Sequence, residues 1–181
     1  MKILGICGSS RRGSFNLALL EEAKRMLPRG STLEIFDISI FPLFSQDLER
    51  NLPASVKEFK QKIREADAIL IASPEHNYSI TAQLKNAIEW GNRPGEDNSW
   101  DGKPAAIISA SSGARGGVRS QLHLRQIMVD LNMYPINEPE LLIGREREAF
   151  DENLHLKDES ARQLLARVIE NLLAWTETLK S

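Results

Sequence analysis

The sequence is poor in cysteine, in long apolar runs and in excess charge. Cys7 is the only cysteine among 181 residues, so no intramolecular disulfide can form, which is typical of a reducing compartment. No apolar stretch approaches the roughly 20 residues needed to span a bilayer. The formal net charge of −2 gives no electrostatic reason to expect binding to nucleic acid or to a membrane surface. We therefore expect a cytoplasmic protein, and no signal peptide because an apolar run begins already at Ile3.

Familiar catalytic groupings are also missing. No Ser-His-Asp grouping and no set of side chains at metal-ligand spacing stands out in the sequence, so we expect neither a catalytic side chain nor a metal site. Internal repeats, low-complexity segments and linkers are absent as well. The composition, with 41% hydrophobic and 27% charged residues, is ordinary for a soluble protein, and the length predicts a single domain over residues 1–181.

Strand and helix patterns alternate along the chain. Apolar runs predict five strands, at residues 3–7, 32–38, 68–72, 105–110 and 141–143. Apolar residues at helical spacing predict a helix after each strand, the second opened by a capping box of Ser55 and Glu58 and the last over 158–179. Irregular segments are expected at 39–52, 92–102 and 144–157. Such alternation predicts an α/β fold, a parallel sheet with helices on both faces.

The segment between the first strand and the first helix has the composition of an anion-binding loop. Gly8–Asn16 contains glycines, hydroxyls and two arginines, and a helix that starts after such a turn aims backbone N–H groups at an anion. Gly8 and Gly13 fit the spacing G-x-x-x-x-G, but Ser14 stands where a P-loop has lysine. The loop therefore suits a metal-free terminal phosphate, such as that of FMN, better than a nucleoside triphosphate. A solvated turn with charged side chains is the alternative.

Two further loops are rich in polar residues and glycine. Residues 73–80 follow the third strand, and residues 111–117 follow the fourth. In the flavodoxin-like strand order 2-1-3-4-5, both would meet the Gly8–Asn16 loop in one crevice at the carboxyl ends of the strands.

Four segments together resemble a known family. They are Gly8–Asn16, Pro74–Ser79, Leu84–Trp90, and Gly116–Arg119 with His123–Gln126. Their order and composition resemble the NADPH-dependent FMN reductase family of flavodoxin-like proteins, most closely its quinone reductase members, also called chromate reductases. The resemblance implies a flavodoxin-like sheet of five parallel strands in the order 2-1-3-4-5.

The resemblance also implies an activity and a site. It implies an enzyme that uses FMN to pass electrons from NADPH or NADH, in a ping-pong cycle, to quinones or to acceptors such as chromate, ferric chelates or azo compounds. The expected partners are these small molecules and further copies of the chain, in a homodimer or homotetramer. The cofactor-binding residues that it implies are Ser9, Arg11, Ser14, Phe15, Asn16, Pro74, Glu75, His76, Asn77, Tyr78, Ser111, Ser112, Gly113 and Gly116.

The sequence allows two interpretations of several residues. His76 stands where the family has tyrosine, and it would either tune the flavin or only cover it. For Glu75 we favour a positional role over acid–base chemistry, because flavin reactions do not require a carboxylate. Arg145, Arg147 and the glutamates beside them are most simply a solvated segment.

The sequence also allows alternative functions. A flavodoxin-type electron carrier without nicotinamide turnover, or a phosphate-binding domain without flavin, would share the loop and the fold. The aromatic residues near the crevice, Tyr78, Trp90 and Trp100, suit an interface between subunits. The sequence does not distinguish NADH from NADPH.

Overall fold

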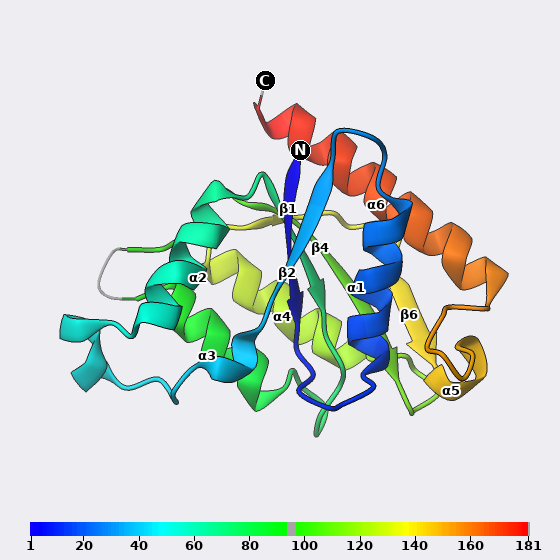
Figure 1. The fold of residues 1–181 in the computed structure, drawn as a ribbon, viewed down its shortest axis with the longest axis horizontal. Coiled ribbons are helices and arrows are strands. Elements are labelled where there is room, and N and C mark those ends of the chain that lie inside the picture. Colours follow the sequence, from blue (N-terminus) through cyan, green and yellow to red (C-terminus); the bar gives the residue numbers. More distant parts are fainter. Residues whose placement is uncertain (94–96, 181) are drawn as a thin grey trace.

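A computed structural model describes residues 1–93 and 97–180, and within them it shows a parallel sheet with helices on both faces (Figure 1). The strands are β1 (Lys2–Cys7), β2 (Thr32–Phe36), β3 (Ala68–Ala72), β4 (Pro104–Ser111), β5 (Tyr134–Pro135) and β6 (Leu141–Gly144). The helices are α1 (Phe15–Met26), α2 (Ala54–Glu65), α3 (Ala82–Gly91), α4 (Val118–Asp130), α5 (Glu146–Ala149) and α6 (Glu159–Lys180).

The strand order confirms the predicted flavodoxin-like topology. The sheet runs β2-β1-β3-β4, and every described pair of strands is parallel. The fifth position holds two short strands, because β5 pairs with the start of β4 at Pro104 and β6 pairs with its end from Ile108 to Ser111. The predicted fifth strand corresponds to β6, and β5 was not predicted. That residues 1–181 form one domain stays a prediction.

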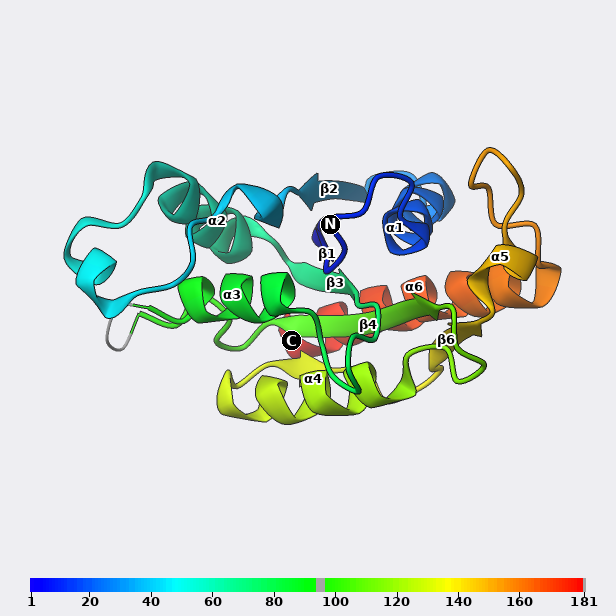
Figure 2. The same cartoon turned by 90° about the horizontal axis from the view of Figure 1, so that it is seen from below.

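The sheet separates two apolar cores. On one face, α1 and α6 pack against alternate strand residues such as Ile3 and Leu70. On the other face, α2, α3 and α4 pack against Leu4 and Ile69. Figure 2, which views the molecule from below, shows α4 and α6 on opposite sides of β4. Because successive side chains of a strand point to opposite faces, a strand covered on both sides is apolar throughout, as the run Ala68–Ala72 predicted.

Three local predictions were wrong. The capping box at Ser55 and Glu58 does not form, because α2 starts directly after Pro53, which has no side-chain acceptor. The expected loop 39–52 overlaps two short 3₁₀ helices, Ile38–Ile40 and Gln46–Asn51. The expected loop 144–157 contains α5. The expected loop 92–102 falls partly on residues 94–96, which lie outside the described residues.

Trp90 and Trp100 belong to the core, so neither side chain is available to a subunit interface. Trp90 and Trp100 are at most 1% exposed. The Trp90 indole donates to the Pro42 carbonyl at 2.9 Å, and the Trp100 indole donates to that of Ile88 at 3.2 Å. Of the three aromatic residues predicted to suit an interface, only Tyr78 is exposed.

No helix among the described residues combines the length and the apolar character that a membrane crossing requires. No group of three or more His, Cys, Asp or Glu side chains there could hold a metal ion.

Candidate functional site

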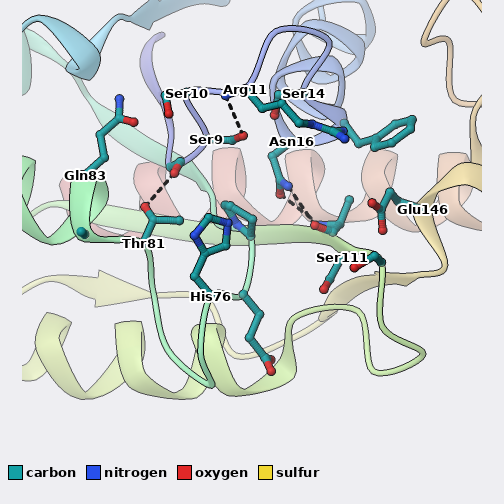
Figure 3. A pocket seen from close by; sticks show the side chains of 17 residues that line it. Ser9, Ser10, Arg11, Ser14, Asn16, His76, Thr81, Gln83, Ser111 and Glu146 are labelled. Atoms are coloured by element: carbon teal, nitrogen blue, oxygen red, sulfur yellow. Dashed lines mark hydrogen bonds between the residues drawn. The ribbon is translucent and has the colours of Figure 1, made fainter.

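The loops after β1, β3 and β4 meet in a pocket of about 560 Å³ at the carboxyl ends of these strands (Figure 3). Ten of the predicted site residues line it: Ser9, Arg11, Ser14, Phe15, Asn16, Pro74, Glu75, His76, Ser111 and Ser112. The other four, Asn77, Tyr78, Gly113 and Gly116, are not among the lining residues. The prediction that the three loops converge on one crevice is therefore confirmed by the geometry.

The loop after β1 presents hydrogen-bond donors to the pocket. The Ser14 hydroxyl caps α1 by accepting from the Leu17 N–H at 3.3 Å, and Ser14 is buried. The side chain of Arg11 is exposed and donates to the Gly13 carbonyl at 3.2 Å. Ser9 accepts from the Arg11 N–H at 3.4 Å, which turns the loop back on itself. The first-turn N–H groups of α1 have no partner within the helix and carry its partial positive charge.

Asn16 joins this loop to the centre of the sheet. Its side-chain N–H donates to the Ala110 carbonyl at 2.8 Å, and its side-chain oxygen accepts from the Ala110 N–H at 3.0 Å (dashed lines in Figure 3). Asn16 is only 4% exposed. The amide therefore fixes the start of α1 against the end of β4, so Asn16 acts on the pocket mainly by positioning.

The loop after β3 forms a tight turn. The backbones of His76 and Ser79 exchange two hydrogen bonds of 2.9 Å, and Asn77 and Tyr78 between them both have positive φ angles of 48° and 69°. Two central residues with positive φ are the requirement of a type I′ turn. Asn77 and Tyr78 thus form the exposed tip of the turn, whereas His76 and Pro74 reach the pocket.

Glu75 anchors the turn to α4. Its carboxylate accepts from the Arg119 backbone N–H at 3.1 Å and from the Arg119 guanidinium at 3.0 Å. That guanidinium also lies 3.7 Å from the centre of the Tyr78 ring. The geometry supports the positional role expected for Glu75, because both of its oxygens hold the first turn of α4.

The loop after β4 divides into a lining part and a packing part. Ser111 and Ser112 line the pocket. Gly116 packs away from it, with φ of 62°, and a Cβ there would lie 2.6 Å from the Leu142 carbonyl carbon. Gly113 accepts from the Arg145 N–H at 3.2 Å. Both glycines therefore shape the contact between this loop and β6.

Sequence reasoning missed several lining residues. Thr81 caps α3 by accepting from the Leu84 N–H at 3.1 Å and donates to the Gly8 carbonyl at 2.7 Å, which links two of the loops. Glu146, at the start of α5, is 8% exposed, so its interpretation as part of a solvated segment was wrong. One Glu146 carboxylate oxygen has no hydrogen-bond partner among the described residues. A threonine three residues before an apolar helix position was the available signal for Thr81; none existed for Glu146.

The pocket fits FMN in its donor chemistry and its size. Hydroxyls, a guanidinium and helix N–H groups gather at one end, which is the donor set that a terminal phosphate needs. The volume lies within the range of roughly 300–1,000 Å³ that is typical for small-molecule sites. A Cβ at Gly8 would come within 3.2 Å of the Pro74 ring, so glycine lets the first two loops approach closely.

Fold and site together define a flavodoxin-like protein with a phosphate-accepting pocket at its topological switch point. The model of the NADPH-dependent FMN reductase family matches residues 1–148. The chain belongs to this family, which confirms the resemblance and its enzyme class, with FMN and NAD(P)H as cofactors.

Named relatives cover nearly the whole chain. An NAD(P)H-dependent FMN reductase of Pseudomonas aeruginosa is 45% identical over 181 residues, 99% of this chain and 97% of that protein. An NADPH:quinone oxidoreductase of Arabidopsis thaliana is 44% identical over 188 residues, 99% of this chain and 94% of that protein. Among solved structures, the flavoenzyme NAD(P)H:(acceptor) oxidoreductase FerB of Paracoccus denitrificans superposes with a TM-score of 0.90 at 30% identity, covering 98% of this chain and 97% of FerB.

Proposed function

We propose that this protein passes electrons from NADPH or NADH, through FMN held in the pocket, to quinones and similar small acceptors in a ping-pong cycle. The observation that carries the proposal is the meeting of three polar loops in one pocket at the carboxyl ends of β1, β3 and β4. Relatives named FMN reductases and quinone oxidoreductases support it. Chromate, ferric chelates and azo compounds are further acceptors in this proposal.

In this proposal, some pocket residues bind the cofactor and others position the loops. Ser9, Arg11 and Ser14, with the first-turn N–H groups of α1, would hold the phosphate of FMN. Pro74 and His76 on one loop and Ser111 and Ser112 on another would hold the rest of the cofactor. Asn16 and Glu75 keep these loops in place through the contacts described above. When bound, FMN supplies the hydride and electron transfer itself.

A shared opening of the pocket supports this order of events. His76 and Ser112 are exposed where the pocket meets solvent. A nicotinamide donor and a quinone would therefore use the same opening in turn, which supports a ping-pong cycle. No side chain has to supply a nucleophile in this scheme.

A spectrum and a rate measurement test the proposal. The protein, mixed with FMN and desalted, should retain a flavin absorbance spectrum and should oxidise NADPH when menadione or ferricyanide is present. Double-reciprocal plots at several menadione concentrations should be parallel. Loss of the flavin on desalting would overturn the pocket assignment. Retained flavin without NADPH oxidation would favour an electron carrier, and intersecting lines would exclude the ping-pong order.

We also propose a homodimer or homotetramer. Tyr78, at the tip of the turn after β3, is 64% exposed, and on α4 Leu122 and Val129 are 53% and 81% exposed. Large apolar side chains exposed on these two elements suit a subunit interface that runs from the turn after β3 along α4. Light scattering should give a mass of at least twice the chain's 20.3 kDa. A fully active monomer at micromolar concentration would exclude the proposal.

A further inference from the structure

Glu146 is a buried acidic residue to which the proposed function gives no role. It opens α5 and lines the pocket together with Arg11, Phe15 and Ser111. Only 8% of the residue is exposed. Figure 3 shows its side chain reaching from α5 toward the pocket, on the side where Ser111 lies. Because burial of an unpaired carboxylate is strongly unfavourable, this arrangement indicates a partner that a ligand supplies.

The Glu146 carboxylate has no partner within residues 1–93 and 97–180. One of its oxygens is buried without a hydrogen bond, and Glu146 takes part in none of the ion pairs in this part of the chain. The other buried acid there, Glu22, is paired with both Arg25 and Arg162. Glu146 therefore differs from Glu22 in having only the pocket from which a hydrogen-bond donor can come.

The chemistry of a carboxylate restricts which part of FMN Glu146 can contact. A carboxylate only accepts hydrogen bonds. The phosphate of FMN is a negatively charged acceptor as well, so the two groups repel each other. The hydrogen-bond donors of FMN are the hydroxyls of its ribityl chain and the N3–H of its ring. The partner of Glu146 must therefore belong to the chain or to the ring.

The place of α5 in the fold favours the ribityl chain. Phe150, which directly follows α5, packs against Phe15, the first residue of α1, with the ring centres 5.0 Å apart. Arg11, in the loop that would hold the phosphate, lines one hollow with Glu146 and an adjacent hollow with Arg147. Glu146 thus lies toward the phosphate end of the pocket, and the ribityl hydroxyls are the FMN donors nearest to the phosphate.

We propose that Glu146 binds FMN by accepting a hydrogen bond from a hydroxyl of its ribityl chain. The carboxylate then gains a partner that no described residue provides, so cofactor binding relieves an unfavourable burial. Glu146 acts in binding and orienting the cofactor and takes no part in electron transfer. This inference rests on the proposed function, because it takes the pocket as the site of FMN.

The affinities for two flavin phosphates test this contact. FMN and an analogue with an unsubstituted five-carbon chain in place of the ribityl chain share the ring and the phosphate and differ only in the hydroxyls. The wild type should bind FMN at least about 10-fold more tightly than the analogue, because a hydrogen bond to a charged group is lost. Glu146→Leu should lower this ratio about 10-fold, and Glu146→Gln, which keeps a neutral acceptor, should lower it less. Fluorescence titration of the FMN-free full-length chain measures each constant.

A stability measurement separates binding from a structural role. In the FMN-free protein, Glu146→Leu should have a thermal unfolding midpoint equal to or above that of the wild type. The reason is that an apolar side chain of similar size replaces a buried charge that has no partner. A lower midpoint would mean that Glu146 supports the fold through a protein partner, and it would overturn the inference.

Glu148→Leu is the matched control, because Glu148 is an exposed acid on the same helix and does not line the pocket. It should leave the affinities for FMN and for the analogue unchanged. Equal losses of both affinities in Glu146→Leu would overturn the inference. Methylation of FMN at N3 should not alter the effect of Glu146→Leu, and loss of that effect would assign the carboxylate to the ring and overturn the inference as well.

These titrations also separate the inference from the proposed electron transfer, because they involve no NADPH. A protein that binds the two flavins in the expected ratios but does not oxidise NADPH would support the role of Glu146 and refute the electron transfer. A wild type that binds no FMN would refute the assignment of the pocket, and the inference with it.

Discussion

Arg11 and Arg12 are neighbours in the chain, but only Arg11 lines the pocket. We therefore expect Arg11→Ala to weaken FMN binding by about one to two decades in Kd, since a charge-assisted hydrogen bond contributes about 1.5–3 kcal/mol. Arg12→Ala should have a much smaller effect. Quenching of FMN fluorescence on titration measures both constants. Equal constants for the wild type and Arg11→Ala would remove Arg11 from the phosphate site.

Asn16 should matter for folding as well as for the pocket. Asn16→Ala leaves the N–H and the carbonyl of Ala110 without their partner in a buried site. Each buried group left unpaired costs about 1–3 kcal/mol, so the loss of both partners should lower the free energy of unfolding by about 2–6 kcal/mol. Urea denaturation of the FMN-free protein gives this value. Asn153→Ala, at an exposed position, is the control, and a loss no larger than in the control would contradict the positioning role.

At the scale of elements, Gly116 is a tightly packed position in the junction between β4 and α4. Gly116 has φ of 62°, and a Cβ there would collide with the backbone of β6 at Leu142. Gly116→Ala should therefore destabilise the fold by more than about 2 kcal/mol, through backbone strain and displacement of β6. Gly113 is three residues earlier in the same loop, and a Cβ there would meet nothing within 4 Å. Thermal unfolding of both variants tests this, and similar midpoints would refute it.

The sequence predicts an element well when the element's own residues carry the pattern. The run Ala68–Ala72 is apolar throughout because β3 is covered on both faces. In contrast, β5 has only two residues, Tyr134–Pro135, and exists because the first residues of β4 lie beside it. Likewise, α5 has four residues and no complete apolar face. Elements of this length depend on their tertiary neighbours and have no local signal.

The same distinction applies to the site. The family resemblance indicated which loops meet, and ten of the fourteen cofactor-binding residues that it implied line the pocket. The resemblance did not show how each residue acts, because Asn16, Glu75 and Gly116 contact residues that are distant from them in the sequence. Glu146 was not predicted as a site residue, because a glutamate between two arginines is typical of a solvated segment. Glu146 is buried only by the tertiary fold.

At the scale of the whole molecule, Asp67 connects the two ends of the chain. Its carboxylate, just before β3, accepts from the Lys2 N–H at 2.6 Å and pairs with the Lys180 ammonium at 2.8 Å. The pKa of Asp67 lies below its ordinary value of 3.8, chiefly because of Lys180 and then of the Lys2 N–H. A lowered pKa in the folded state stabilises the fold above pH 3.8, and this contribution is lost as the pH falls through the folded value.

Asp67→Asn should thus destabilise the protein near neutral pH and not in acid. Because the pair is partly exposed and screened by solvent, the loss at pH 6 to 7 should be about 0.5–1 kcal/mol. The difference from the wild type should shrink as the pH falls below about 3.8. Denaturation curves at several pH values test this, with Asp130→Asn at an exposed site as control. A difference that does not change with pH would exclude the ionic contribution.

This connection also sets how the protein can be attached to a surface. Met1 and Lys180 lie at the amino ends of the strands (Figure 1), and the pocket lies at their carboxyl ends. A molecule tethered through either end to an electrode or a bead would therefore turn its opening toward the bulk liquid. Electrons would then reach the flavin from dissolved reagents more readily than from the support.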